Sequence, residues 1–249
     1  MNTTRYGNEL AVELAQVSVK YQQLAVFNQL DFALPQQQIT AVVGESGCGK
    51  STLLKLINGL VPPASGSIRL HGQSQTHPFN TTVRRGIGYA VQQIGLFPHL
   101  SAYENIALLA KLDDWQQQTI QQRVSYLAEC MGLPSTLLQR YPHQLSGGQA
   151  QRVGLCRSLM VKPGILLLDE AFSAVDPITR KEVHERFLQL HQEEPRAVLL
   201  VTHDMREAVK IADKIAVMHK GEIVQHGTVS TVMDQPANDY IARLIKDHI

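Results

Sequence analysis

The sequence has few cysteines and no long apolar runs, and each shortage argues against a class of protein. Only three cysteines occur among 249 residues, at positions 48, 130 and 156, with no CxxC pair and no histidine cluster at metal-ligand spacing. They are expected to be reduced thiols in a cytosolic protein. Apolar runs such as 165–168 are far shorter than the roughly 20 residues of a membrane-spanning helix, and no N-terminal apolar segment indicates export.

A surplus of charge of one sign is also lacking. The chain carries 23 Lys and Arg against 22 Asp and Glu, a formal net charge of +1, so nothing requires a nucleic-acid partner. Apolar residues make up 44% of the chain, which is enough for a sizeable core in one large α/β unit or two joined lobes. We find no internal repeat and no extended heptads.

The first quarter of the chain predicts strands followed by a loop and a helix. Residues 11–34 alternate between apolar and polar in the manner of antiparallel edge strands. Residues 39–43 are a compact β-branched run, and 51–60 have the composition of a helix. A glycine-rich segment separates the last two elements.

The middle of the chain has a helical pattern, and strands return after it. Ser101 and Glu104 form a capping-box pattern near the start of a helical insert over about 100–160. Beyond it the sequence predicts buried strands at 165–168, 197–201 and 215–218, a helix opening at Asp176 and Pro177, a hairpin turn at 219–222 and a last helix over 239–245. A parallel α/β architecture is therefore expected on both sides of the insert.

The glycine-rich segment reads GESGCGKS and matches the phosphate-binding pattern GxxxxGK[ST]. In this pattern, backbone N–H groups and the helix N-terminus surround phosphate oxygens, the lysine reaches the β and γ phosphates, and the serine hydroxyl binds Mg²⁺. An ordinary glycine-rich turn needs no lysine followed by serine. The expected ATP-binding residues here are Gly44, Glu45, Ser46, Gly47, Cys48, Gly49, Lys50, Ser51 and Thr52.

Two carboxylates, Asp169 and Glu170, follow the predicted strand 165–168. The C-terminal edge of strands is where open α/β sheets bind ligands. We expect Asp169 to hold Mg²⁺, usually through water, and Glu170 to polarise the water that attacks the γ-phosphate. Taken alone, the pair could equally be a helix cap or a surface ion pair. The phosphate loop favours the catalytic interpretation.

A third motif consists of Leu145, Ser146, Gly147, Gly148 and Gln149. It resembles the signature of ABC cassettes, and an apolar-periodic helix follows at once, which argues against a flexible Ser/Gly linker. Chemically it is a second phosphate cradle at a helix N-terminus. In the family, the signature of one copy closes on the ATP held by the phosphate loop of its partner. The resemblance implies a symmetric head-to-tail dimer that buries two ATP molecules.

Other residues fall in the order that the family shows. Tyr21 resembles the aromatic residue that stacks on adenine, although a tyrosine at a strand end is more often plain packing. Gln92, preferred over Gln93, resembles the Q-loop glutamine, which reaches Mg²⁺ and the attacking water. His203 resembles the switch histidine that hydrogen-bonds the γ-phosphate. The D-loop, which crosses the dimer axis, is matched by Ser173, Ala174, Val175 and Asp176.

The resemblance thus implies catalytic roles for Glu170, His203 and Gln92, and Mg²⁺ ligation by Ser51, Gln92 and Asp169. The implied fold is an α/β P-loop cassette with a RecA-like core, an antiparallel β subdomain and a helical insert. The implied domain covers 11–245, with core and β subdomain at 11–86 and 161–228, the Q-loop and signature subdomain at 87–160, and a C-terminal helix at 229–249.

The implied function is the ATP-hydrolysing subunit of an ABC importer, held at the cytoplasmic face of the membrane by permease subunits and served by a substrate-binding protein. A soluble ABC ATPase acting on DNA or ribosomes is opposed by the single cassette and the lack of a basic stripe, and a P-loop kinase or GTPase has no use for the signature. The block 89–99 is closest to importers of glycine betaine, choline and other osmoprotectants. Amino-acid and methionine importers remain alternatives.

Overall fold

A computed structural model describes residues 10–22, 24–92 and 95–248, which form two compact units. The first unit takes in the described residues up to Arg84 and those from Arg196 onward. The second runs from Arg85 to Pro195. The predicted subdomain boundaries near 86 and 160 stay predictions.

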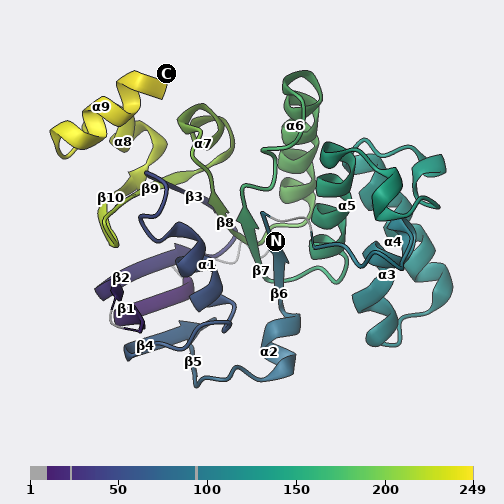
Figure 1. The fold of residues 1–249 in the computed structure, drawn as a ribbon, viewed down its shortest axis with the longest axis horizontal. Helices are drawn as coiled ribbons and strands as arrows, with labels where there is room; N and C mark the ends of the chain where they lie inside the picture. The colour runs from purple at the N-terminus through teal and green to yellow at the C-terminus, as the bar shows by residue number, and fades with distance from the viewer. Residues whose placement is uncertain (1–9, 23, 93–94, 249) are drawn as a thin grey trace, which may run out of the picture. The chain divides into compact units, whose positions relative to one another are not determined.

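An antiparallel sheet opens the first unit, in the strand order β2-β1-β4-β5 (Figure 1). Its strands are β1 (Leu10–Tyr21), β2 (Leu24–Pro35), β4 (Ser65–Leu70) and β5 (Gln73–Gln75). Leu14 lies opposite Phe32 on one side and Ile68 on the other, and all three side chains are buried. The alternation over 11–34 therefore reflects one buried face, as predicted.

A second group of strands in this unit runs in the order β10-β9-β3-β8. The strands are β3 (Ile39–Val43), β8 (Ala197–Val201), β9 (Lys214–His219) and β10 (Glu222–Thr228). β3 pairs in parallel with both β8 and β9, and every residue of β3 and β8 is buried, which explains their continuous apolar runs. The predicted hairpin is confirmed, with Lys220 and Gly221 at positive φ between antiparallel β9 and β10.

The helices of the first unit correct two predicted helix ends. They are α1 (Lys50–Ile57), α7 (Met205–Ile211), α8 (Val229–Asp234) and α9 (Asp239–His248), and α2 (Thr81–Arg85) ends at the unit boundary. The helix predicted to reach residue 60 ends at Ile57, ahead of Gly59 at φ 66°. The C-terminal segment holds two helices because Pro236 cannot continue α8, and the last helix begins at Asp239, as predicted. The last of them extends to His248, beyond the predicted end at 245.

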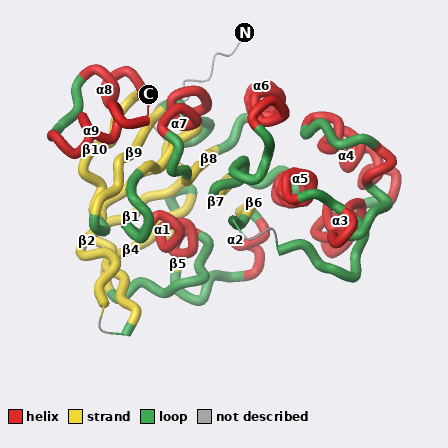
Figure 2. The backbone as a smooth tube through the Cα atoms, turned by 45° about the horizontal axis from the view of Figure 1, so that its top comes forward, coloured by secondary structure: helices red, strands yellow, loops and turns green. Residues whose placement is uncertain are grey.

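The second unit contains two parallel strands and four longer helices (Figure 2). They are β6 (Ile87–Ala90), β7 (Ile165–Asp169), α3 (Ala102–Leu112), α4 (Gln117–Cys130), α5 (Gly147–Leu159) and α6 (Pro177–Glu193), with short 3₁₀ turns at Ser135–Leu137 and Pro142–Gln144. The capping box of Ser101 and Glu104 is confirmed at the start of α3.

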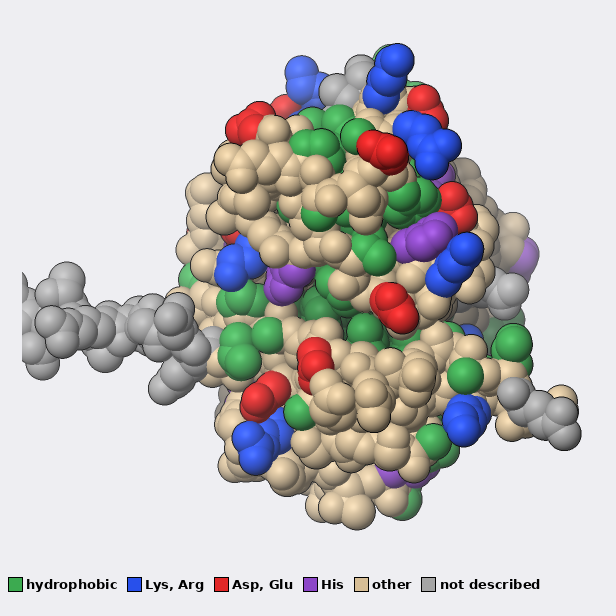
Figure 3. Space-filling view, turned by 90° about the vertical axis from the view of Figure 1, so that its left-hand side faces the viewer, with side chains coloured by type: hydrophobic (Ala, Val, Ile, Leu, Met, Phe, Trp, Pro, Cys, Tyr) green, Lys and Arg blue, Asp and Glu red, His purple; other side chains and the backbone are tan. Residues whose placement is uncertain are grey.

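On the face of the molecule drawn in Figure 3, acidic and basic side chains are interspersed among apolar ones. Neither sign of charge gathers into a single patch on that face, which matches the near balance of charge along the chain.

Candidate nucleotide site

The glycine-rich loop joins β3 to α1, and its lysine is drawn back onto the loop. Lys50 is only 8% exposed, and its Nζ donates hydrogen bonds to the carbonyl oxygens of Gly44 (2.8 Å) and Glu45 (2.7 Å). The positive charge is thus held at the loop by two neutral acceptors. Phosphate oxygens are stronger acceptors for an ammonium than carbonyl groups are, so a bound phosphate would compete well for this charge.

The N-terminus of α1 also suits an anion. Its N-cap is Gly49, no side chain caps it, and its first turn has no acidic residue. By contrast, α7 is capped by Asp204, which accepts from the amides of Arg206 and Glu207. The positive end of α1 is therefore not offset by a carboxylate of its own. These residues fit the triphosphate of ATP.

The first unit carries three further predicted residues or groups. Ser51 and Thr52 lie in the first turn of α1 and are partly buried. Tyr21 ends β1 and is 44% exposed. His203 is exposed and follows β8, after the buried Thr202. The first unit thus holds the loop, Tyr21 and His203, while the remaining predicted residues belong to the second unit.

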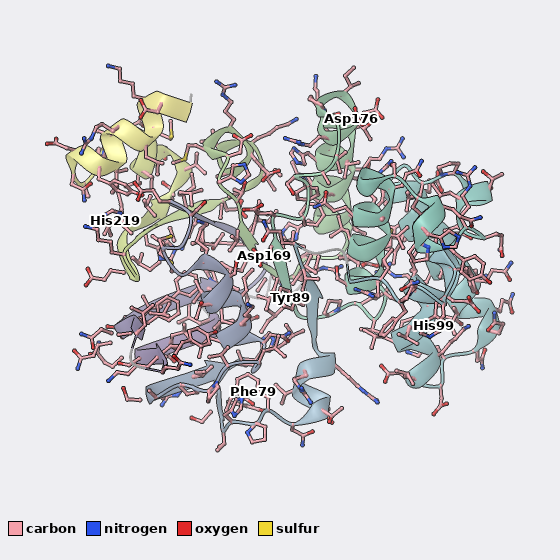
Figure 4. The ribbon with its side chains drawn as sticks, in the orientation of Figure 1. Phe79, Tyr89, His99, Asp169, Asp176 and His219 are labelled. Atoms are coloured by element: carbon pink, nitrogen blue, oxygen red, sulfur yellow. The ribbon has the colours of Figure 1, made fainter. Side chains whose placement is uncertain are left out.

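In the second unit, Asp169 ends β7 and is only 5% exposed. Tyr89 lies on the neighbouring strand β6, and Figure 4 shows the two residues close together. Burial and, to a smaller extent, the nearby Asp169 carboxylate together raise the pKa of Tyr89 to about 12. The phenol therefore stays protonated at neutral pH and adds no negative charge beside the Asp169 carboxylate. Asp169 therefore has the character of a buried anionic ligand suited to Mg²⁺.

Glu170 has the left-handed backbone conformation, with φ at 50°. Two glutamines hold it there. Gln92 Nε2 donates to its Oε2 at 2.9 Å, and Gln151 Nε2 donates to its backbone oxygen at 2.8 Å. A sparsely populated conformation held by its surroundings is typical of functional sites. The structure therefore brings together two of the three predicted catalytic residues, Gln92 and Glu170, whereas Gln93 lies outside the described residues.

Gln151 is a site residue that the sequence interpretation missed. It is 5% exposed, and besides holding Glu170 it accepts a hydrogen bond from the Ala174 amide at 2.9 Å through Oε1. One amide side chain thus connects α5, the backbone of Glu170 and the D-loop. The available signal was its place one turn after Gly147, where a glutamine interrupts the apolar face of the helix.

The signature segment begins α5 and closes on itself through a capping box. Ser146 Oγ accepts from the Gln149 amide at 3.3 Å, and Gln149 Oε1 accepts from the Ser146 amide at 3.0 Å. The serine hydroxyl keeps its own proton available for donation. A Cβ added at Gly148 would lie 2.9 Å from the Ala174 carbonyl oxygen, so only glycine lets the D-loop approach this closely.

The D-loop is held from both ends. Asp176 caps α6 by accepting from the Thr179 amide at 3.0 Å, a hydrogen bond that keeps the pKa of the Asp176 carboxyl below its usual value. Arg180 donates to the backbone oxygens of Val175 at 2.8 Å and Ser173 at 3.1 Å. The segment between signature and α6 is therefore fixed by its backbone, leaving the exposed Ser173 and Ala174 side chains at the surface.

Within the described ranges, three or more His, Cys, Asp and Glu side chains nowhere gather into a group that could hold a metal. Mg²⁺ sites usually need only one or two carboxylates together with substrate phosphates. The predicted set of Ser51, Gln92 and Asp169 belongs to that kind. None of the described helices combines the length and the apolar character needed to cross a membrane.

Comparison with known proteins gives the class of protein. The model of the family described as "ABC transporter" matches residues 27–173, and the chain belongs to that family. It is similar to a post-hydrolysis dimer of the ATP-binding cassette MJ0796 bound to ADP and Pi, with a TM-score of 0.81 and 27% identity over 88% of this chain and 98% of that one. The predicted cassette fold, with its antiparallel β subdomain, is confirmed.

Similar curated proteins are named for transport, uptake or import of a solute. One is a glycine betaine/carnitine/choline transport ATP-binding protein of Bacillus subtilis (strain 168), 41% identical over 94% of this chain and 62% of the relative. Another is a glycine betaine uptake system ATP-binding protein of Escherichia coli (strain K12), 42% identical over 92% and 75%. A sulfate/thiosulfate import ATP-binding protein of Mycobacterium bovis is 41% identical over 93% and 65%. The chain spans less than two thirds of the Bacillus and Mycobacterium relatives.

Proposed function

We propose that this chain is the ATP-hydrolysing subunit of an ABC importer. The observation that carries the proposal is that two hydrogen bonds hold Glu170 in place. Gln92 donates to its carboxylate, and Gln151 donates to its backbone oxygen. A surface ion pair or helix cap needs no such arrangement, whereas a general base must be held in one orientation. Membership of the family supplies the nucleotide as substrate.

Hydrolysis is phosphoryl transfer to water, in which the protein positions groups and stabilises charge. Glu170 polarises the attacking water, Gln92 keeps the carboxylate oriented, and His203 donates a hydrogen bond to the γ-phosphate. Lys50 leaves the carbonyl oxygens of the loop for phosphate oxygens, and the uncapped N-terminus of α1 adds its partial positive charge. Mg²⁺, held by Ser51, Asp169 and Gln92, would neutralise charge on the β and γ phosphates.

The second copy of the chain supplies the rest of the site. A signature at one helix N-terminus and a phosphate loop at another give each copy two phosphate-binding ends, and a two-fold axis would pair them in an isologous interface. The dimeric state of the similar MJ0796 cassette supports this arrangement. Permease subunits would hold the dimer at the cytoplasmic face of the membrane, and a substrate-binding protein would deliver the solute.

The proposed solute is a quaternary amine such as glycine betaine or choline. The resemblance of residues 89–99 and the names of several relatives support it. The alternative solutes are sulfate, because a sulfate/thiosulfate import protein is about as similar in sequence, and amino acids such as methionine. In this proposal, residues 89–99 dock on the permease and so determine which permease the chain serves. The permease in turn determines the solute, which never contacts this chain.

Two assays test the proposal. The purified chain should hydrolyse ATP only with Mg²⁺, and Lys50→Ala should reduce the rate at least 100-fold, the order expected when charge stabilisation at the phosphates is lost. Deleting the gene should abolish uptake of radiolabelled betaine or choline and leave methionine, histidine and sulfate uptake intact. Loss confined to one of the comparators would overturn the solute, and Mg²⁺-independent or absent hydrolysis would overturn the ATPase.

A further inference from the structure

The phosphate loop lies against the end of β9 and its hairpin. The Gly221 amide donates to the Cys48 carbonyl oxygen at 3.0 Å. A Cβ at Gly44 would lie only 2.1 Å from the Met218 carbonyl oxygen, so the loop and β9 touch backbone to backbone. The shape of the loop therefore depends on residues 218–221.

The C-terminal helix α9 is fastened to the same place. Ile241 is fully buried in an apolar cluster with Val43 and Val217, the strand residues that lead to the loop and to the hairpin. The preceding residue, Tyr240, packs its ring on that of His219, with ring centroids 4.1 Å apart. Figure 4 places His219 beside the C-terminal helices. A side chain of α9 thus covers the part of β9 against which the loop lies.

Two polar atoms of this ring pair are buried and have no hydrogen-bond partner among the described residues. They are the Tyr240 hydroxyl and His219 Nδ1. Burial raises the pKa of Tyr240 and the Glu45 carboxylate raises it further, while the Glu45 backbone amide acts in the opposite direction. The Glu45 amide is therefore a backbone donor near the hydroxyl, although the two groups form no hydrogen bond in this structure. Buried unpaired polar atoms lower stability, so their presence needs an explanation.

We propose that Tyr240, braced by His219, is a positioning residue for the phosphate loop. The Gly44 carbonyl oxygen, which belongs to the same peptide group as the Glu45 amide, is one of the two acceptors that hold Lys50. When phosphate draws Lys50 away, this peptide group is released, and the Tyr240 hydroxyl then accepts a hydrogen bond from the Glu45 amide. The helix α9 thereby stabilises the nucleotide-bound shape of the loop. This inference rests on the proposed ATP-binding function.

Tyr240→Phe is the direct test, because it keeps the ring packing and removes the hydroxyl alone. The Kd for a fluorescent ATP analogue should rise about 3- to 10-fold, the range expected for one net hydrogen bond. The KM for ATP should rise by the same factor with kcat changed less than about 2-fold, since the contact stabilises the ground state and the transition state equally. The unfolding midpoint without nucleotide should stay the same or rise, because an unpaired buried group has been removed.

A positioning role predicts weaker nucleotide binding together with an unchanged or higher unfolding midpoint, whereas a plain packing role predicts that binding and stability fall together. A fall in both stability and affinity, or an unchanged Kd, would overturn the inference. His219→Phe, which keeps a stacked ring, provides an independent variant and should weaken binding in the same direction. The matched control is Tyr103→Phe, which removes a hydroxyl bonded to Gln117 in the second unit and should leave the Kd unaltered. Failure of the unaltered chain to bind the analogue would instead defeat the proposed function.

Discussion

Replacing Gly148 by alanine should destabilise the second unit by forcing the signature helix away from the D-loop. The added Cβ would lie 2.9 Å from the Ala174 carbonyl oxygen and 3.3 Å from the Val175 Cα, both of them backbone atoms that cannot rotate aside. Ordinary contacts of a Cβ begin at 3.4 Å. Overpacking of this kind costs about 1–3 kcal/mol. For a chain of this size, that corresponds to a fall of about 3–10 °C in Tm.

The neighbouring Gly147 supplies the control, because a Cβ there would meet only the Ala174 side chain, at 3.9 Å. Both changes are glycine to alanine in the first turn of the same helix, so the gain in helix propensity cancels when the two variants are compared. Thermal unfolding without nucleotide should leave Gly147→Ala at or above the Tm of the unaltered chain, with Gly148→Ala below it. Equal Tm values for the two variants would refute the close approach of signature and D-loop.

Two further variants test the carboxylate. Glu170→Gln should keep ATP binding, since its amide oxygen can still accept from Gln92, but lower kcat at least 100-fold, as expected for loss of a general base. ATP without Mg²⁺ should then trap a dimer on a sizing column, and a monomer with and without ATP would count against the shared site. Gln151→Ala should lower stability by about 1–3 kcal/mol and lower kcat, because the Glu170 oxygen and the Ala174 amide lose their partner. An unchanged kcat would show that Gln151 has only a structural role.

Most of the fold could be predicted from local patterns. The buried strands β3, β7 and β8 are continuous apolar runs bounded by polar turns, and the helix starts at Ser101, Ser146 and Asp176 carry side-chain caps. The errors lie at helix ends: α1 ends at Ile57, ahead of Gly59, and α9 runs on to His248.

The site was less predictable, because the spacing of residues within a motif does not show which residues far apart in the sequence come into contact. The motifs give the residues of the phosphate loop, the carboxylates and the signature. They do not give the two bonds of Gln151, which join residues 19 and 23 positions apart. Nor could spacing reveal Tyr240, which lies nearly two hundred positions after Glu45. Both depend on how strands and helices pack, which the sequence pattern alone does not specify.

The central claim is that ATP is bound between the phosphate loop of one copy and the signature of another. Ser146→Arg and Lys50→Ala should each fail alone to form an ATP-dependent dimer. Mixed together, they contain one intact composite site, made of Lys50 from the first variant and Ser146 from the second. The mixture should therefore recover ATP-dependent dimers and single-turnover hydrolysis. No recovery of either from two folded variants would contradict the head-to-tail arrangement.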